Sequence, residues 1–212
     1  MTSQSSNVRC TRRSALVVAA LCAASFAFAA SPAAVPAQPA TIAAAALPSN
    51  SIYQLAVPLT DQNGRTSQLD ERRGHPMLVS MFYTSCKFVC PMLIEAVRET
   101  EAKLSVEDRK ELSILMVSID PAHDTVAVLK QTADERHLDG AHWTLARTDA
   151  AHLRKLAAVL GVQYRALANG DFNHTSSLIL VDADGRIAGR TNRLGDADPA
   201  FVKLVKASLT TH

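Results

Sequence analysis

The chain of 212 residues has few cysteines and lacks the glycine-rich loops that bind nucleotides. Of its four cysteines, only Cys86 and Cys90 lie beyond the first 30 residues. Gly-x-Gly-x-x-Gly and P-loop patterns are both absent, so nucleotide binding has no support. No internal repeat is visible.

Acidic residues are missing from the N-terminal part, where none precedes Asp61. The basic residues of this part are Arg9, Arg12 and Arg13, and without them the count of Lys and Arg falls from 22 to 19, against 20 Asp and Glu. The remainder of the chain is therefore close to neutral. It shows no basic patch, which argues against nucleic acid as a partner.

An apolar run covers residues 15–30 and is interrupted only by Ser25. With the preceding arginines and the small residues of Ala27-Phe28-Ala29, it predicts that residues 1–30 are a secretory signal peptide. The run is shorter than the roughly 20 apolar residues of a membrane-spanning helix. An uncleaved N-terminal anchor is the alternative.

The leader carries two further features. Arg12-Arg13 gives a weak indication of twin-arginine export, and Cys10 and Cys22 are expected to be removed with the leader. The Ala- and Pro-rich residues 31–50 have no apolar periodicity and predict a disordered linker. The remaining residues 51–212 have the size of one domain.

Strand and helix patterns alternate through this domain. A hairpin turn is expected at residues 61–64, and a second turn at 183–185. The order predicts an α/β sandwich with a central mixed sheet, flanking helices and an N-terminal β-hairpin. The expected strands are 52–57, 66–69, 77–83, 112–119, 143–145, 177–182 and 186–190; the expected helices follow Pro91 and cover 125–136, 149–160 and the C-terminus.

Cys86 and Cys90 lie between an expected buried strand and an expected helix, with Pro91 where a first helical turn tolerates proline. If the helix has begun by Cys90, its amide dipoles favour the thiolate there. Two such thiolates can close a disulfide or hold a soft metal such as Cu(I) or Zn(II). A purely structural disulfide is the alternative. The dithiol between strand and helix indicates a thioredoxin-like domain.

Three stretches resemble the Sco/SenC family of copper-binding thioredoxin-like proteins. The first is Phe82-Tyr83-Thr84-Ser85-Cys86 with Cys90-Pro91, which resembles the family's Cys-x-x-x-Cys-Pro motif. The second is Ser118-Ile119-Asp120-Pro121 with Asp124-Thr125, and the third is His174 before the strand at 177–182. Together they span most of the expected domain.

The resemblance implies that Cys86, Cys90 and His174 are copper ligands and that the two cysteines also form a redox dithiol. Two thiolates and one imidazole suit Cu(I), and the same set accepts Cu(II) with an added ligand. Two residues between the cysteines depart from the family, Lys87 and Phe88, where proline and an acidic residue are usual. Lys87 would stabilise the Cys86 thiolate.

Other candidates have ordinary structural interpretations. Asp120 and Asp124 lack a nucleophile or phosphate loop beside them, so Asp120-Pro121 is expected to end a strand and Asp124 or Thr125 to cap the next helix. His123 could lie near the dithiol, whereas the other histidines are expected at the surface. Core packing is favoured over a copper relay for four methionines: Met77, Met81, Met92 and Met116.

The resemblance implies an exported, periplasmic copper metallochaperone, tethered to the inner membrane if the leader is uncleaved. Its client would be an apo copper-enzyme subunit of the copper A type, as in a terminal oxidase. Other periplasmic copper chaperones or thiol reductants are further expected partners. The rival is a thiol-disulfide oxidoreductase that reduces the client's cysteines, and a weaker third interpretation is a peroxide-consuming or redox-sensing thiol protein.

Overall fold

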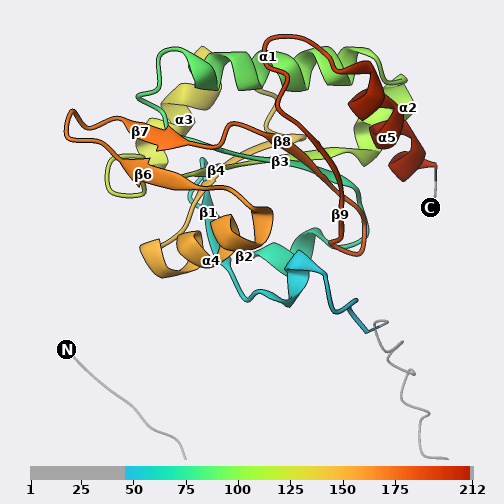
Figure 1. Ribbon diagram of the computed structural model, residues 1–212, viewed down its shortest axis with the longest axis horizontal. Coiled ribbons are helices and arrows are strands. Elements are labelled where there is room, and N and C mark those ends of the chain that lie inside the picture. The colour runs from blue at the N-terminus through green and yellow to red at the C-terminus, as the bar shows by residue number, and fades with distance from the viewer. Residues whose placement is uncertain (1–45, 211–212) are drawn as a thin grey trace, which may run out of the picture. The chain divides into compact units, whose positions relative to one another are not determined.

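The computed structural model describes residues 46–210 (Figure 1). The expected leader and residues 31–45 of the expected linker lie outside this range. Within it, Leu47 already packs partly against the core, and the carbonyl of Pro48 accepts hydrogen bonds from Ser51 N (3.0 Å) and Gln54 Nε2 (2.6 Å). The folded unit therefore includes residues just before position 51.

A seven-stranded mixed sheet forms the centre, with strand order β2-β1-β5-β4-β3-β8-β9. β3 lies between β4, to which it is parallel, and β8, to which it is antiparallel. Every residue of β3 is buried, as expected for a strand covered on both faces. The strands are β1 (Pro58–Asp61), β2 (Thr66–Gln68), β3 (Met77–Phe82), β4 (Ser113–Ser118), β5 (Trp143–Arg147), β8 (Leu178–Val181) and β9 (Ile187–Thr191).

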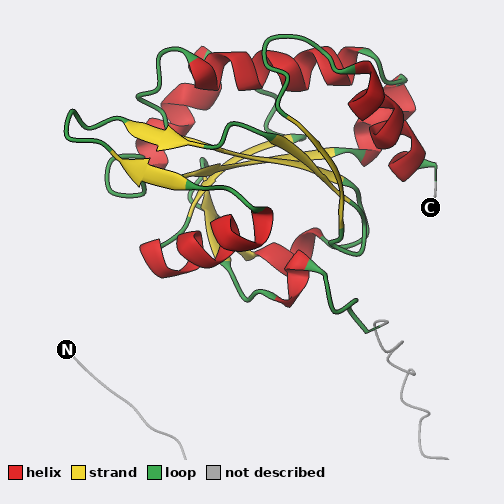
Figure 2. Ribbon diagram, viewed as in Figure 1, coloured by secondary structure: helices red, strands yellow, loops and turns green. Residues whose placement is uncertain are grey.

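Helices cover both faces of the sheet, with α1 and α5 on one side and α4 on the other (Figure 2). Polar side chains cap four of them: Ser105 caps α2, Thr125 caps α3, Asp149 caps α4 and Asp198 caps α5. Each accepts hydrogen bonds from backbone N–H groups of the first turn. The helices are α1 (Val89–Ala102), α2 (Val106–Glu111), α3 (Val126–Glu135), α4 (Ala150–Leu160) and α5 (Pro199–Leu209).

A second, two-stranded sheet consists of β6 (Tyr164–Ala166) and β7 (Phe172–His174), paired antiparallel with Tyr164 opposite His174. This hairpin was not predicted from the sequence, and neither was α2. The hairpin matters because its second strand ends at His174.

The predicted mixed sheet with flanking helices and an N-terminal hairpin is confirmed, but the predicted strand at 52–57 is wrong. Residues Ile52–Gln54 form a 3-10 helix, η1, in which the Ser51 side chain accepts from Tyr53 N. Ile52 and Tyr53 are adjacent in the chain and both are buried, whereas successive side chains of a half-exposed strand alternate between the core and solvent. The predicted strand 66–69 also ends early, because Leu69 begins a second 3-10 helix, η2 (Leu69–Arg72).

Three of the four methionines are core residues as predicted: Met77, Met81 and Met116 are at most 1% exposed. The prediction was wrong for Met92, which is 44% exposed on α1. Within residues 46–210, none of the helices combines the length and apolar character needed to cross a membrane.

Candidate functional site

The two cysteines lie in the connection from β3 to α1. The N–H of Cys86 donates to the carbonyl of Tyr83 (3.3 Å), which forms a turn directly after β3. α1 begins at Val89, and Phe88 at its N-cap makes no side-chain capping bond. Instead, the N–H of Cys90 donates to Cys86 Sγ (3.3 Å). The sulfur therefore satisfies one of the unpaired amides of the first helical turn.

This arrangement separates the two thiols chemically. Burial raises the pKa of the Cys86 thiol, but hydrogen bonds from Cys90, Phe88 and Val89 outweigh it and leave that pKa below its ordinary value. Burial raises the pKa of Cys90 strongly, with an added contribution from the neighbouring Cys86. The expectation of a thiolate favoured at Cys90 is therefore wrong: its sulfur is buried, and the helix amides point at Cys86.

His174 lies at the end of β7 and is half-buried. Its Nδ1 lies 3.1 Å from the carbonyl oxygen of Thr175. Because a carbonyl only accepts, Nδ1 carries the proton and the lone pair resides on Nε2. Burial lowers the pKa of the imidazole, although the bond to Thr175 opposes this. A neutral ring with a fixed tautomer is the form that binds metal ions.

Tyr83 connects the cysteine turn to β7. It is 5% exposed, and its ring meets that of His174 edge-on, with centroids 5.8 Å apart and planes at 78°. The ring also packs on Phe172 at 5.2 Å, and the hydroxyl accepts a hydrogen bond from Phe172 N (3.4 Å). Sequence reasoning did not single out Tyr83, although it directly follows a buried strand and precedes the dithiol.

The structure brings Cys86 and Cys90 together, and Tyr83 makes contact with both His174 and the cysteine turn. Over residues 46–210, no group of three His, Cys, Asp or Glu side chains is gathered closely enough to hold a metal ion. The two thiols and His174 thus supply three suitable donors from neighbouring elements without forming a closed three-ligand site.

Asp124 is hydrogen-bonded to the connection that carries the cysteines. Its carboxylate accepts from the N–H (3.2 and 3.3 Å) and hydroxyl of Thr84 and from the hydroxyl of Ser118. Thr125, rather than Asp124, caps α3. Asp124 is 1% exposed, so it positions the connection instead of facing solvent.

Three further histidines of the described residues bond groups other than the dithiol. The side chain of His123 is 83% exposed and bonds Asp120 through Nδ1 (2.8 Å). His75 pairs with Glu111 (3.2 Å), and His152 pairs with Asp149, the cap of α4. No bond links any of these three histidines to Cys86 or Cys90 in the part of the chain that the structure describes.

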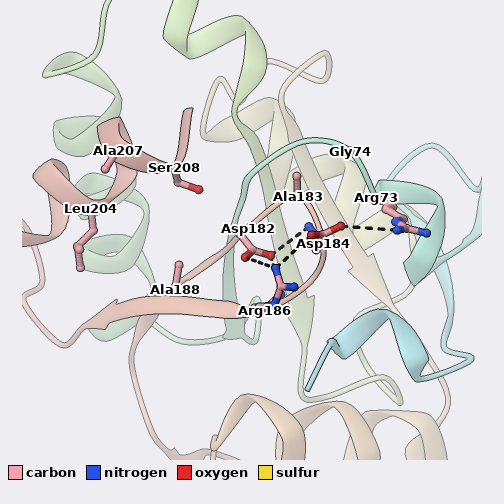
Figure 3. A pocket seen from close by; sticks show the side chains of 10 residues that line it. All are labelled: Arg73, Gly74, Asp182, Ala183, Asp184, Arg186, Ala188, Leu204, Ala207 and Ser208. Carbon is pink, nitrogen blue, oxygen red and sulfur yellow. Dashed lines mark hydrogen bonds and ion pairs between the residues drawn. The ribbon is translucent and has the colours of Figure 1, made fainter. Parts of the chain in front are cut away.

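A hollow of about 610 Å³ lies elsewhere, between the β8–β9 turn and α5 (Figure 3). Within it, Arg186 bridges Asp182 (3.5 Å) and Asp184 (3.1 Å), and Arg73 pairs with Asp184 (3.6 Å). Two arginines thus balance two carboxylates. None of the predicted site residues lines this hollow.

The chain is similar to several known proteins. A family model described as SCO1/SenC matches residues 48–208. A Stutzerimonas stutzeri protein named for copper binding is 27% identical over 135 residues, covering 62% of this chain and 65% of that protein. The SCO1 protein homolog of Bacillus subtilis is 25% identical over 130 residues, covering 60% and 67%. The chain spans slightly less than two thirds of the length of the first of these relatives.

Solved structures show the same fold. Bradyrhizobium japonicum ScoI with copper bound has a TM-score of 0.58 and 27% identity, covering 72% of this chain and 96% of that one. BsSco, a member of the Sco family of cytochrome c oxidase assembly proteins, has a TM-score of 0.62 and 22% identity, covering 73% and 92%.

The mixed sheet, the flanking helices and the dithiol at a strand-to-helix turn define a thioredoxin-like protein. Because the family model covers more than half of the chain, the chain belongs to the SCO1/SenC family.

Proposed function

We propose that this protein is a copper metallochaperone that holds its cargo through Cys86, Cys90 and His174. The observation that carries the proposal is the pair of free thiols in one turn, joined through Tyr83 to a neutral histidine. Thiolate and imidazole are the donors that copper prefers. Membership in the SCO1/SenC family and the copper named for ScoI support the same cargo.

The donor set fits copper by its chemistry. Cys86 already accepts N–H hydrogen bonds that favour its thiolate, and metal binding would require Cys90 to lose its proton as well. Nε2 of His174 has its lone pair available because Nδ1 is held by Thr175. Hydrogen bonds at the second ring nitrogen are a common means of orienting a metal-binding histidine.

Copper titration of the reduced protein tests this proposal. We expect about one Cu(I) per chain, and loss of tight binding in Cys86→Ser and Cys90→Ser, because no other cysteine lies beyond the expected leader. Met92→Leu is the matched control, since it removes an exposed sulfur near the same turn. Equal copper retention by the double cysteine variant would overturn the proposal.

His174 is tested separately with both oxidation states. His174→Ala should weaken Cu(II) strongly and Cu(I) less, because two thiolates alone can hold Cu(I). His123→Ala is the control, since that side chain is exposed and paired with Asp120. An unchanged Cu(II) spectrum in His174→Ala would remove this residue from the ligand set.

A second candidate function is thiol-disulfide exchange with the cysteines of a client. The observation that favours it is the contrast between a half-buried Cys86 with a lowered pKa and a buried Cys90 with a raised pKa. A reactive thiol beside a protected one is typical of redox dithiols. Brisk reduction of insulin disulfides, together with alkylation that Cu(I) does not slow, would favour this function over copper delivery.

The proposal also includes the protein that receives the copper and the cellular location of this chain. BsSco belongs to the Sco family of cytochrome c oxidase assembly proteins, and this supports an apo copper A subunit as the recipient. Export to the periplasm rests on the predicted leader, which lies outside the described residues. Fractionation of cells that produce the full chain, with mass spectrometry of its N-terminus, tests export and cleavage together.

A further inference from the structure

One residue, Tyr83, contacts two of the three proposed ligands, Cys86 and His174. Its carbonyl accepts from the N–H of Cys86 (3.3 Å). Its ring meets His174 edge-on, with a centroid distance of 5.8 Å. The backbone contact is available to any residue at this position, whereas the ring and hydroxyl contacts require a tyrosine or, for the ring alone, a phenylalanine.

The tyrosine hydroxyl joins two elements that the sheet does not join. β3 belongs to the central sheet, whereas β7 pairs only with β6. A two-stranded ribbon is marginally stable by itself, so contacts to the rest of the domain determine where it lies. The N–H of Phe172 donates to the Tyr83 hydroxyl (3.4 Å), which ties the start of β7 to the end of β3.

The hydroxyl can accept from Phe172 and donate its own proton. With its carbonyl on the N–H of Cys86 and its ring against His174, Tyr83 lies between the cysteine turn and the strand that carries His174.

We propose that the Tyr83 hydroxyl is a positioning group that fixes β7, and with it His174, relative to Cys86 and Cys90. The inference rests on the proposed copper function. Because Cu(II) depends on His174 more than Cu(I) does, loss of the hydroxyl should affect the two oxidation states unequally.

Tyr83→Phe removes only the hydroxyl and retains the buried ring. We expect Cu(II) affinity to fall on the order of five- to tenfold, the size of one hydrogen bond, with Cu(I) affinity changed less than twofold. Tyr164→Phe is the matched control, because Tyr164 lies opposite His174 on β6 and its hydroxyl makes no hydrogen bond within the described residues. Its Cu(II) affinity should equal that of the wild type.

A copper-free measurement accompanies the titration. In Tyr83→Phe the backbone amide of Phe172 loses its acceptor, so hydrogen exchange at that amide should accelerate roughly five- to tenfold while amides of β3 stay protected. The His174 ring signals in NMR spectra should shift in the same variant and stay unchanged in Tyr164→Phe. Both readouts hold whether or not the protein carries copper.

A double-variant cycle determines whether Tyr83 acts through His174. Adding Tyr83→Phe to His174→Ala should cause no further loss of Cu(II) affinity. An additive loss, or wild-type Cu(II) affinity in Tyr83→Phe, would overturn the inference, as would faster Phe172 exchange without any change in Cu(II) binding. If the wild type itself bound no copper, the proposed function would fail, and the Phe172 exchange would still decide whether the hydroxyl holds β7.

Discussion

Cys86 and Cys90 occupy different environments although their sulfurs share one turn. Cys90 is 5% exposed within the core, whereas Cys86 accepts the backbone N–H groups that begin α1. Thiolates are the nucleophilic form of cysteine. In the proposed thiol-disulfide exchange, Cys86 would therefore make the initial attack and Cys90 would be the thiol that closes the disulfide.

Alkylation of the reduced protein with iodoacetamide should modify Cys86 first. Because a lowered pKa populates the thiolate at lower pH, the rate at Cys86 should rise and level off below the pH of about 8.5 at which an unperturbed thiol titrates. Cys90, with a raised pKa and a buried sulfur, should react at least about tenfold more slowly. Peptide mass spectrometry across pH 5 to 9 measures both rates.

The same experiment in urea supplies the control, since both thiols should then react alike. Faster modification of Cys90 than of Cys86 in the folded protein would contradict the assignment.

At the scale of elements, Asp124 links the β3–α1 connection to the β4–α3 connection. Asp124→Ala leaves the Thr84 N–H and two hydroxyls without their acceptor, so the free energy of unfolding should fall by about 2 to 4 kcal/mol. Urea denaturation measures the change. Asp134→Ala, which removes an exposed partner of Lys130, should cost less than about 1 kcal/mol. Equal effects in both variants would show that Asp124 is not a structural link.

The β8–β9 turn supports η1 through Gly185. A Cβ on Gly185 would lie 2.3 Å from Ser51 Oγ and 2.5 Å from Tyr53 Cδ2, whereas a Cβ on Gly170 would meet nothing within 4 Å. Both glycines have nearly the same φ, +85° and +86°. Each alanine variant therefore has similar backbone strain of about 1 kcal/mol, and only Gly185→Ala adds a clash.

Thermal denaturation should accordingly show Gly185→Ala to be less stable than Gly170→Ala by about 1 to 3 kcal/mol. Identical melting temperatures in the two variants would mean that η1 shifts to relieve the clash without loss of stability.

Much of the element pattern could be predicted because strands such as β3 and β4 are continuous apolar runs and helix α3 has an N-terminal threonine cap. The turn that carries the cysteines could also be predicted, because it lies between a predicted strand and a predicted helix. The β6–β7 hairpin was missed because its strands have three residues each, too few for a periodicity. Asn169-Gly170 at its turn is a recognised hairpin signal and could have indicated it. The hydrogen bond from the N–H of Phe172 to the Tyr83 hydroxyl could not be predicted, since it depends on how close two distant segments lie in the folded chain.

For the whole molecule, binding of copper to the native state alone should stabilise the fold by mass action. At free Cu(I) of 100 times the dissociation constant the gain is about 2.7 kcal/mol, which corresponds to a rise in melting temperature of roughly 5 to 10 °C for a domain of this size. Differential scanning calorimetry in a Cu(I) buffer measures it. The Cys86→Ser/Cys90→Ser variant should show no rise, and a rise there would indicate binding elsewhere.

The place of β3 in the sheet has a consequence for the time course of folding. Met77 and Val79 of β3 pair with Val181 and Ile179 of β8, which lie near the other end of the chain. Contacts between such distant segments form late, because closing the long loop between them costs entropy before any pairing repays it. Both cysteines precede His174 along the chain and are therefore synthesised well before it. In the proposed ligand set, His174 would accordingly be the last of the three side chains to take its place, after a stage with two thiols and no histidine beside them.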